Sequence, residues 1–97
     1  MLFAVICADK PGHLNLRMET RPPHVEWLNG LNAAGTLKIG GPFLDGDGKP
    51  CGSMLLIAAD SLEDAKALAA QDPYAKAGLF EPVEIKPYNW VFNNPEA

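Results

Sequence analysis

The sequence predicts an α+β fold, because strand-like apolar runs and helical stripes follow each other in one regular order. That order is strand, helix, strand, strand, helix, strand, which is the split βαβ pattern of ferredoxin-like folds. It implies an antiparallel sheet of four strands in a βαββαβ arrangement. The 97 residues contain no linker or internal repeat, so we expect one domain over 1–97.

The first half of the chain predicts a strand followed by helical structure. Residues 2–8 are rich in Phe, Val and Ile and end at the turn-forming segment 9–12, as strands do. A helical stripe covers 13–20, and two prolines follow Arg21. Because the residue before a proline avoids the α region, we expect the helix to break or bend at Arg21, with a second helix over 22–34.

The middle of the chain predicts a hairpin and a further helix. Residues 36–43 and 52–59 read as strands, and the segment 44–50 between them contains the turn sequence Asp-Gly-Asp-Gly. Ser61 is a suitable N-cap for a helix that runs to about residue 70.

The last third predicts a short helical turn and a final strand. Asp72 followed by proline opens a helical turn that Gly78 ends. The strand covers 82–92. Its apolar residues change from one face of the strand to the other along its length, and a bulge near Pro87 would account for that change. We expect the tail over 93–97 to be loose.

The charge of the chain disfavours several classes of partner. The net charge is −4, and the 8 Lys and Arg are scattered, so no basic patch favours nucleic acid or an anionic membrane. The apolar start is too short for a signal core or a membrane span, which makes a cytoplasmic protein the default. Cys7 and Cys51 read as structural thiols, although the sequence does not exclude a bond between them.

In the first and third strands, both the odd and the even positions carry apolar residues. This indicates that both sheet faces are buried. Two helices cover only one face. We therefore expect a homodimer packed sheet to sheet.

His24 and Asp72 are the best candidates for a working pair. Near the start of the expected second helix, the helix dipole and partial burial would both favour a neutral imidazole, the form a general base needs. A carboxylate on the other ring nitrogen would fix the tautomer. Each residue also has a simpler interpretation: Asp72 as an N-cap and His24 as a rim histidine.

Four further residues are candidates for contacts with a ligand. Arg17 and Arg21 are four apart, and on an unbroken helix they would share a face with His24 to hold an anionic oxygen, or else form a solvated face. Gly41, within Gly-Gly-Pro, allows close backbone approach or merely a bend. Ser53 starts the next strand and could face Gly41, but no nucleophile elbow surrounds it. With two histidines and no phosphate or calcium loop, we expect no metal and no cofactor.

The ordered motifs resemble the YciI-like (YCII-related) family, and the segments that carry the resemblance are 21–24, 40–42, 52–53, 72–74 and 86–90. The resemblance implies a dimeric α/β barrel in which His24 and Asp72 form a catalytic dyad. It further implies that Arg17, Arg21, Gly41 and Ser53 belong to the same pocket. Dehydrochlorination of hydroxylated chloroaromatics is attached to some members.

Three functions are compatible with these residues. The first is a cofactor-independent enzyme that performs an elimination, dehydrochlorination or isomerisation on a small aromatic or enolisable molecule. The second is a non-catalytic homodimer that binds a small ligand in the same pocket. The third is a purely structural dimer.

Overall fold

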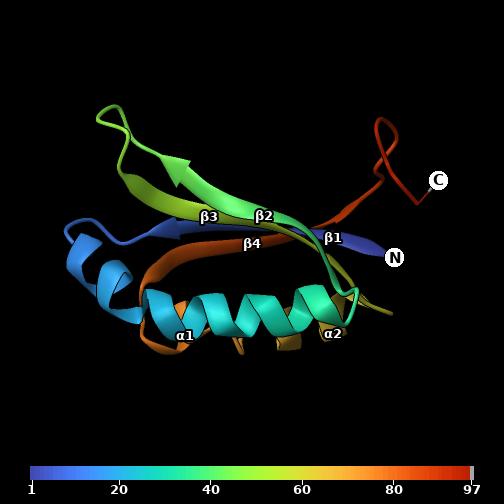
Figure 1. The fold of residues 1–97 in the computed structure, drawn as a ribbon, viewed down its shortest axis with the longest axis horizontal. Helices are drawn as coiled ribbons and strands as arrows, with labels where there is room; N and C mark the ends of the chain where they lie inside the picture. The colour runs from blue at the N-terminus through green and yellow to red at the C-terminus, as the bar shows by residue number, and fades with distance from the viewer. Residues whose placement is uncertain (97) are drawn as a thin grey trace.

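The computed structural model describes residues 1–96 and places all its helices on one side of a four-stranded sheet (Figure 1). The elements follow the predicted order, including the short helical turn that was expected after Asp72. They are β1 (Leu2–Asp9), α1 (Leu14–Ala33), β2 (Leu37–Leu44), β3 (Pro50–Ala58), α2 (Leu62–Ala69), α3 (Pro73–Lys76) and β4 (Phe80–Tyr88).

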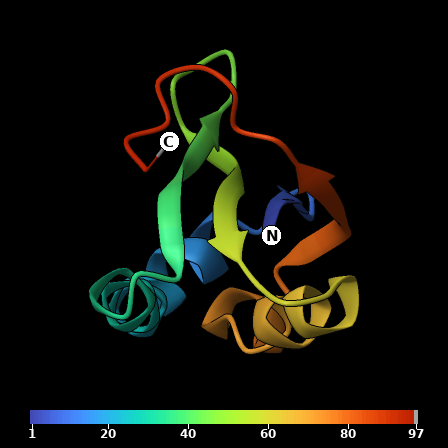
Figure 2. The ribbon, with the colours of Figure 1, turned by 90° about the vertical axis from the view of Figure 1, so that its right-hand side faces the viewer.

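The sheet is antiparallel throughout and has the strand order β2-β3-β1-β4. β1 and β3 therefore lie side by side in the centre of the sheet, with β4 and β2 at its edges, which is the ferredoxin-like arrangement. Figure 2 looks along the layers and shows α1 and the α2–α3 pair lying next to each other beneath the strands. The predicted α+β fold is confirmed.

The core fills the space between sheet and helices because alternate residues of the central strands point to the helical side. Phe3, Val5 and Cys7 of β1 are buried there against Leu55 and Ile57 of β3. The other strand face carries apolar side chains without a helix above them. Figures 1 and 2 show that only the chain after β4 passes over this side.

The expectation of two separate helices in the first half is wrong. A single helix, α1, continues through Pro22 and Pro23. Each proline removes one backbone hydrogen bond from a helix interior. Buried polar contacts on both sides of the prolines, made by Arg17 and His24, hold the two parts in place. Figure 1 shows the first turns of α1 at an angle to the rest, which is the bend that prolines cause.

The local end signals of the other elements are confirmed. The Ser61 hydroxyl accepts a hydrogen bond from the Asp64 amide at 3.1 Å and caps α2. Asp72 caps α3, and Gly35 and Gly78 adopt positive φ angles of 77° and 79° after their helices. Such angles favour glycine because it has no Cβ.

The last strand differs from its prediction. It ends at Tyr88, and its one register shift lies opposite Cys7 and Asp9 of β1, not near Pro87. The expected loose tail lies partly outside the described residues, which end at Glu96. Within them, the Glu96 carboxylate accepts hydrogen bonds from Lys38 Nζ at 2.8 and 3.0 Å.

Within residues 1–96, no helix combines the length and the apolar character that crossing a membrane requires. Cys7 is buried and Cys51 exposed, and both are free thiols. The bond that the sequence left open therefore does not form in this structure.

Candidate active site

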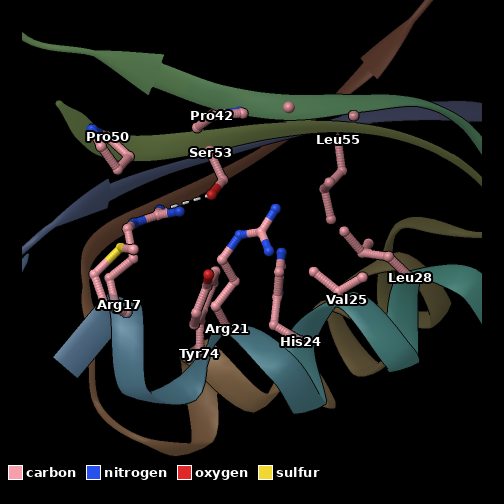
Figure 3. A pocket seen from close by; sticks show the side chains of 13 residues that line it. Arg17, Arg21, His24, Val25, Leu28, Pro42, Pro50, Ser53, Leu55 and Tyr74 are labelled. Carbon is pink, nitrogen blue, oxygen red and sulfur yellow. Dashed lines mark hydrogen bonds between the residues drawn. The ribbon is translucent and has the colours of Figure 1, made fainter. Parts of the chain in front are cut away.

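Three side chains on one face of α1 reach toward the sheet. Arg17, Arg21 and His24 are spaced four and three residues apart, so an uninterrupted helix places them on the same face. All three line a cavity of about 340 Å³ between α1 and the strands β2 and β3 (Figure 3). The unbroken path of α1 through the prolines is therefore what assembles this side of the cavity.

The His24 ring is hydrogen-bonded to the Asp72 carboxylate across the gap between α1 and α3. Its Nδ1 lies 2.7 Å from Asp72 Oδ1, and both side chains are buried. Since a carboxylate accepts, Nδ1 is the donor, and the neutral ring then carries its free electron pair on Nε2. Figure 3 shows the far edge of the ring directed into the cavity.

Asp72 performs both tasks that the sequence suggested for it. Its Oδ1 accepts from the Tyr74 amide at 2.9 Å, which is the N-cap of α3, and from His24 Nδ1. Asp72 is not part of the cavity wall, so it acts on the cavity only through His24.

Tyr74 fixes the plane of the imidazole. The two rings stack with centroids 3.8 Å apart and planes 18° apart, and Tyr74 meets Phe80 edge to face at 5.9 Å. Burial raises the pKa of the Tyr74 phenol above its ordinary value, and the nearby charge of Arg17 opposes that shift. The phenol therefore stays protonated at neutral pH.

Arg17 belongs to a second buried ion pair at the other end of the cavity. Its Nε and Nη2 donate to the two carboxylate oxygens of Asp9 at 2.6 and 2.9 Å, and Nη2 also donates to Ser53 Oγ at 2.8 Å. Burial works against the charge of Arg17, but the hydrogen bonds and charge of Asp9 outweigh it and raise the pKa of the guanidinium. Arg17 remains a cation at any ordinary pH.

The rest of the cavity wall is mostly apolar and includes the predicted Gly41. Gly41 lies on β2 opposite Met54 of β3, and a Cβ on it would meet no atom within 4 Å. Ser53 and Tyr74 also line the cavity, and the remaining lining residues are Met18, Val25, Leu28, Gly40, Pro42, Pro50 and Leu55.

The structure brings the predicted site residues together and corrects part of the reasoning behind them. His24 sits in the middle of a continuous helix, so the dipole of a helix N-terminus does not act on it. Arg17 does not lie on a solvated face, because it is 4% exposed and its partner is Asp9.

Sequence reasoning missed Asp9 and Tyr74. The sequence predicted Asp9 only as the first residue of the turn after the first strand, and nothing in the local sequence connects it to Arg17. Tyr74 does carry a signal, because it directly follows the Asp-Pro pair. In the structure, Tyr74 lies in the first turn of α3 and stacks on His24, the residue that Asp72 also contacts.

The arrangement is suited to proton transfer at an enclosed ligand. It offers a ring nitrogen held in one tautomer, a hydroxyl at Ser53 and two guanidinium groups around one cavity. Within residues 1–96, no three His, Cys, Asp or Glu side chains gather as a metal site would require.

Comparison with known proteins identifies relatives over almost the whole chain. The profile of the YCII-related domain matches residues 1–89. Protein YciI of Escherichia coli O6:H1 is 36% identical over 98 residues, which cover 95% of this chain and 100% of that protein. An uncharacterized protein of Haemophilus influenzae is 34% identical over 99 residues, covering 95% and 100%.

A solved structure agrees with the fold and carries a ligand. The 5-chloro-2-hydroxyhydroquinone dehydrochlorinase TftG of Burkholderia phenoliruptrix AC1100, in complex with 2,5-dihydroxybenzoquinone, superposes with a TM-score of 0.84. It is 31% identical in sequence, and the match covers 92% of this chain and 94% of TftG.

Proposed function

This chain belongs to the YCII-related family, and on that basis we propose that it is a cofactor-independent acid–base enzyme acting on a small hydroxylated aromatic or enolisable molecule. The observation that carries the proposal is the 2.7 Å bond between His24 Nδ1 and Asp72 Oδ1, with the opposite ring edge facing the cavity. A general base needs that geometry: one nitrogen held and the other free.

In the proposed reaction, His24 Nε2 takes a proton from an O–H or C–H group of the substrate. The electron pair left behind moves into the conjugated system of the substrate. In a dehydrochlorination the ring carbon that bears chlorine takes up a proton, and loss of a second O–H proton then expels chloride, so that the net change is loss of HCl. In an isomerisation a different carbon receives the proton and nothing is expelled. Asp72 stabilises the imidazolium that forms, and neither route needs an oxidant. Acid–base help of this kind contributes roughly 10²–10⁴-fold.

The dimensions and polarity of the cavity support a small aromatic substrate. Its volume of about 340 Å³ is near the lower end of small-molecule sites. The mostly apolar walls suit an aromatic ring, while Arg21 and Ser53 suit the oxygens on that ring. The dehydrochlorinase activity of TftG makes a hydroxylated chloroaromatic the first substrate to try.

We further propose a homodimer packed through the sheet face that has no helices, and a cytoplasmic location. The exposed apolar side chains Ile39 and Phe43 on that face support the dimer. Two free cysteines support a reducing compartment.

The test is chloride release from 5-chloro-2-hydroxyhydroquinone by the wild-type protein and by His24→Asn and Asp72→Asn. We expect turnover in the wild type and a loss of about 10²–10⁴-fold in both variants, with folding intact by circular dichroism. His13→Asn is the matched control, because the His13 ring lies against the Pro11 carbonyl at 2.8 Å and outside the cavity wall.

Two other results would reject the enzyme proposal. If the wild type binds hydroxylated aromatics without turnover, and the variants lose affinity alone, the protein is a binding module. If both dyad variants release chloride at the wild-type rate, His24 has no chemical role.

A further inference from the structure

The two arginines of the cavity differ in whether a carboxylate balances their charge. Arg17 is 4% exposed, and its guanidinium lies against the Asp9 carboxylate through two hydrogen bonds. Its charge is therefore neutralised before any ligand arrives. Arg21 is exposed, makes no ion pair with any residue of 1–96, and lines the same cavity as His24 (Figure 3).

The third hydrogen bond of Arg17 fixes the direction of a hydroxyl group. Arg17 Nη2 donates to Ser53 Oγ at 2.8 Å, so one lone pair of that oxygen is occupied. A serine hydroxyl has one hydrogen to donate, and it must point away from the guanidinium that donates to it. Within residues 1–96 no protein acceptor takes this hydrogen, and Ser53 lines the cavity.

We propose that Arg17, held by Asp9, is a positioning residue that directs the Ser53 hydroxyl hydrogen at an oxygen of the bound ligand, while Arg21 is the cation that meets the charge of the ligand. The inference deepens the proposed function, because it assigns separate tasks to groups that the sequence treated alike. It also defines the substrate class more narrowly. The ligand carries one anionic oxygen for Arg21 and a second oxygen that accepts from Ser53.

The geometry explains why this position requires arginine. The planar guanidinium supplies two parallel donors to Asp9 and a further donor to Ser53 from one rigid group. A lysine at position 17 keeps the positive charge but offers no such fork. Arg17→Lys therefore separates the positioning role from a charge role.

The first experiment needs no ligand. The chain has two arginines, so guanidinium-selective ¹H–¹⁵N spectra contain two sets of signals, assigned with Arg21→Lys. We expect slowly rotating, separate Nη signals for Arg17 and averaged signals for Arg21. Ser53→Ala should shift or broaden the Arg17 Nη signals, whereas Ser61→Ala, at the only other serine, should leave them unchanged. Averaged Arg17 signals in the wild type, or no response to Ser53→Ala, would overturn the proposal.

The second experiment is a double-mutant cycle with 2,5-dihydroxybenzoquinone as the probe and its dissociation constant as the readout. Loss of one oriented hydrogen bond weakens binding about tenfold, so Ser53→Ala and Arg17→Lys should each cost about tenfold. Because the two residues act through one hydroxyl, the double variant should also lose about tenfold. A loss near a hundredfold would mean that Arg17 contacts the ligand itself, which contradicts the proposed role.

The two proposals fail separately. If wild-type protein does not bind the quinone, the substrate class of the proposed function is wrong, and the arginine spectra still decide the role of Arg17. If the wild-type protein binds the quinone but the losses of affinity in Ser53→Ala and Arg17→Lys add up in the double variant, the proposed ligand site is retained and the positioning role of Arg17 is rejected.

Discussion

The imidazole of His24 stacks on the ring of Tyr74 at a centroid distance of 3.8 Å, on the same residue whose backbone amide shares the Asp72 oxygen with His24. One short helix therefore supplies both the stacking surface and the hydrogen-bond acceptor for the histidine. The ring is constrained in its plane by the stack and in its rotation by the carboxylate. It can present only Nε2 to the cavity.

Replacing Tyr74 should separate packing from hydroxyl effects. Tyr74→Phe keeps the stack, so we expect stability and turnover close to wild type. Tyr74→Leu keeps an apolar side chain but removes the aromatic contacts, each of which contributes about 0.5–1.5 kcal/mol. Urea unfolding should show that loss, and chloride release should fall because the imidazole is free to turn. Equal turnover in both variants would show that the stack does not orient His24.

A pair of substitutions can separate the two roles of Asp72, as the cap of α3 and as the partner of His24. Asn caps a helix about as well as Asp, so Asp72→Asn should change the stability of α3 little while removing the charge beside His24. Asp72→Ala should lose a further ~1 kcal/mol from the missing cap. Turnover should drop similarly in both. If urea unfolding gave the same stability for both variants, the cap would contribute nothing measurable.

The two thiols should differ strongly in reactivity. Burial, reinforced by the negative charge of Asp72, raises the pKa of Cys7 from 9.0 to about 12, whereas Cys51 is exposed. We expect an aromatic disulfide reagent at pH 8 to modify one thiol in the folded protein and two in denaturant. In Cys51→Ser the folded protein should not react.

The same shift predicts lower stability in alkaline solution. The folded pKa of Cys7 lies above the unfolded value, so its contribution is complete below pH 9 and is lost as the pH rises from about 9 toward 12. In that window the wild type should lose stability faster than Cys7→Ala, by at most about 1.4 kcal/mol per pH unit. Parallel profiles for the two proteins would contradict the shift.

Two glycines near the cavity should respond differently to alanine. A Cβ on Gly52 would lie 2.5 Å from the Cys7 carbonyl oxygen, so β1 and β3 must move apart, at a cost of about 1–3 kcal/mol. Gly41 has no atom within 4 Å of its Cβ position, and Gly41→Ala should fold normally. Thermal melts test both, and a Gly41→Ala melt far below wild type would show hidden crowding.

The proposed dimer can be tested on the face without helices. Ile39, 43% exposed, pairs with Leu56 and so lies opposite the helical side. Ile39→Lys should convert a dimer to a folded monomer in sedimentation velocity, because a buried ammonium has no partner there. Gln71→Lys adds the same charge on the helical side and should leave the dimer intact. A monomeric wild type at micromolar concentration would reject the dimer.

The order of elements could be predicted from the sequence because their signals are local. Strand runs, the Ser61 and Asp72 caps and the glycine stops each act over a few residues. The continuity of α1 could not be predicted in this way. The two prolines are a local penalty, and the contacts that offset it, from Arg17 to Asp9 and from His24 to Asp72, join distant parts of the chain.

The candidate site was partly predictable for the same reason. Arg17, Arg21 and His24 follow from helical spacing once the helix is known to be continuous. The pairing of Arg17 with Asp9 depends on how the first turn of α1 folds back over the end of β1, and no spacing rule encodes that. The resemblance to the family supplied the pairing of His24 with Asp72, which their separation in the chain conceals.

The double use of one Asp72 oxygen affects how relatives are to be interpreted. A descendant that lost its chemistry would still need a group at this position to begin α3, and Asp or Asn would serve. The presence of aspartate in a relative is therefore weak evidence of activity. His24 caps no helix, and the hydrogen bond to Asp72 by which it helps to hold α1 does not require a free ring nitrogen in the cavity. Its loss is therefore the more informative mark of a protein that has changed its role.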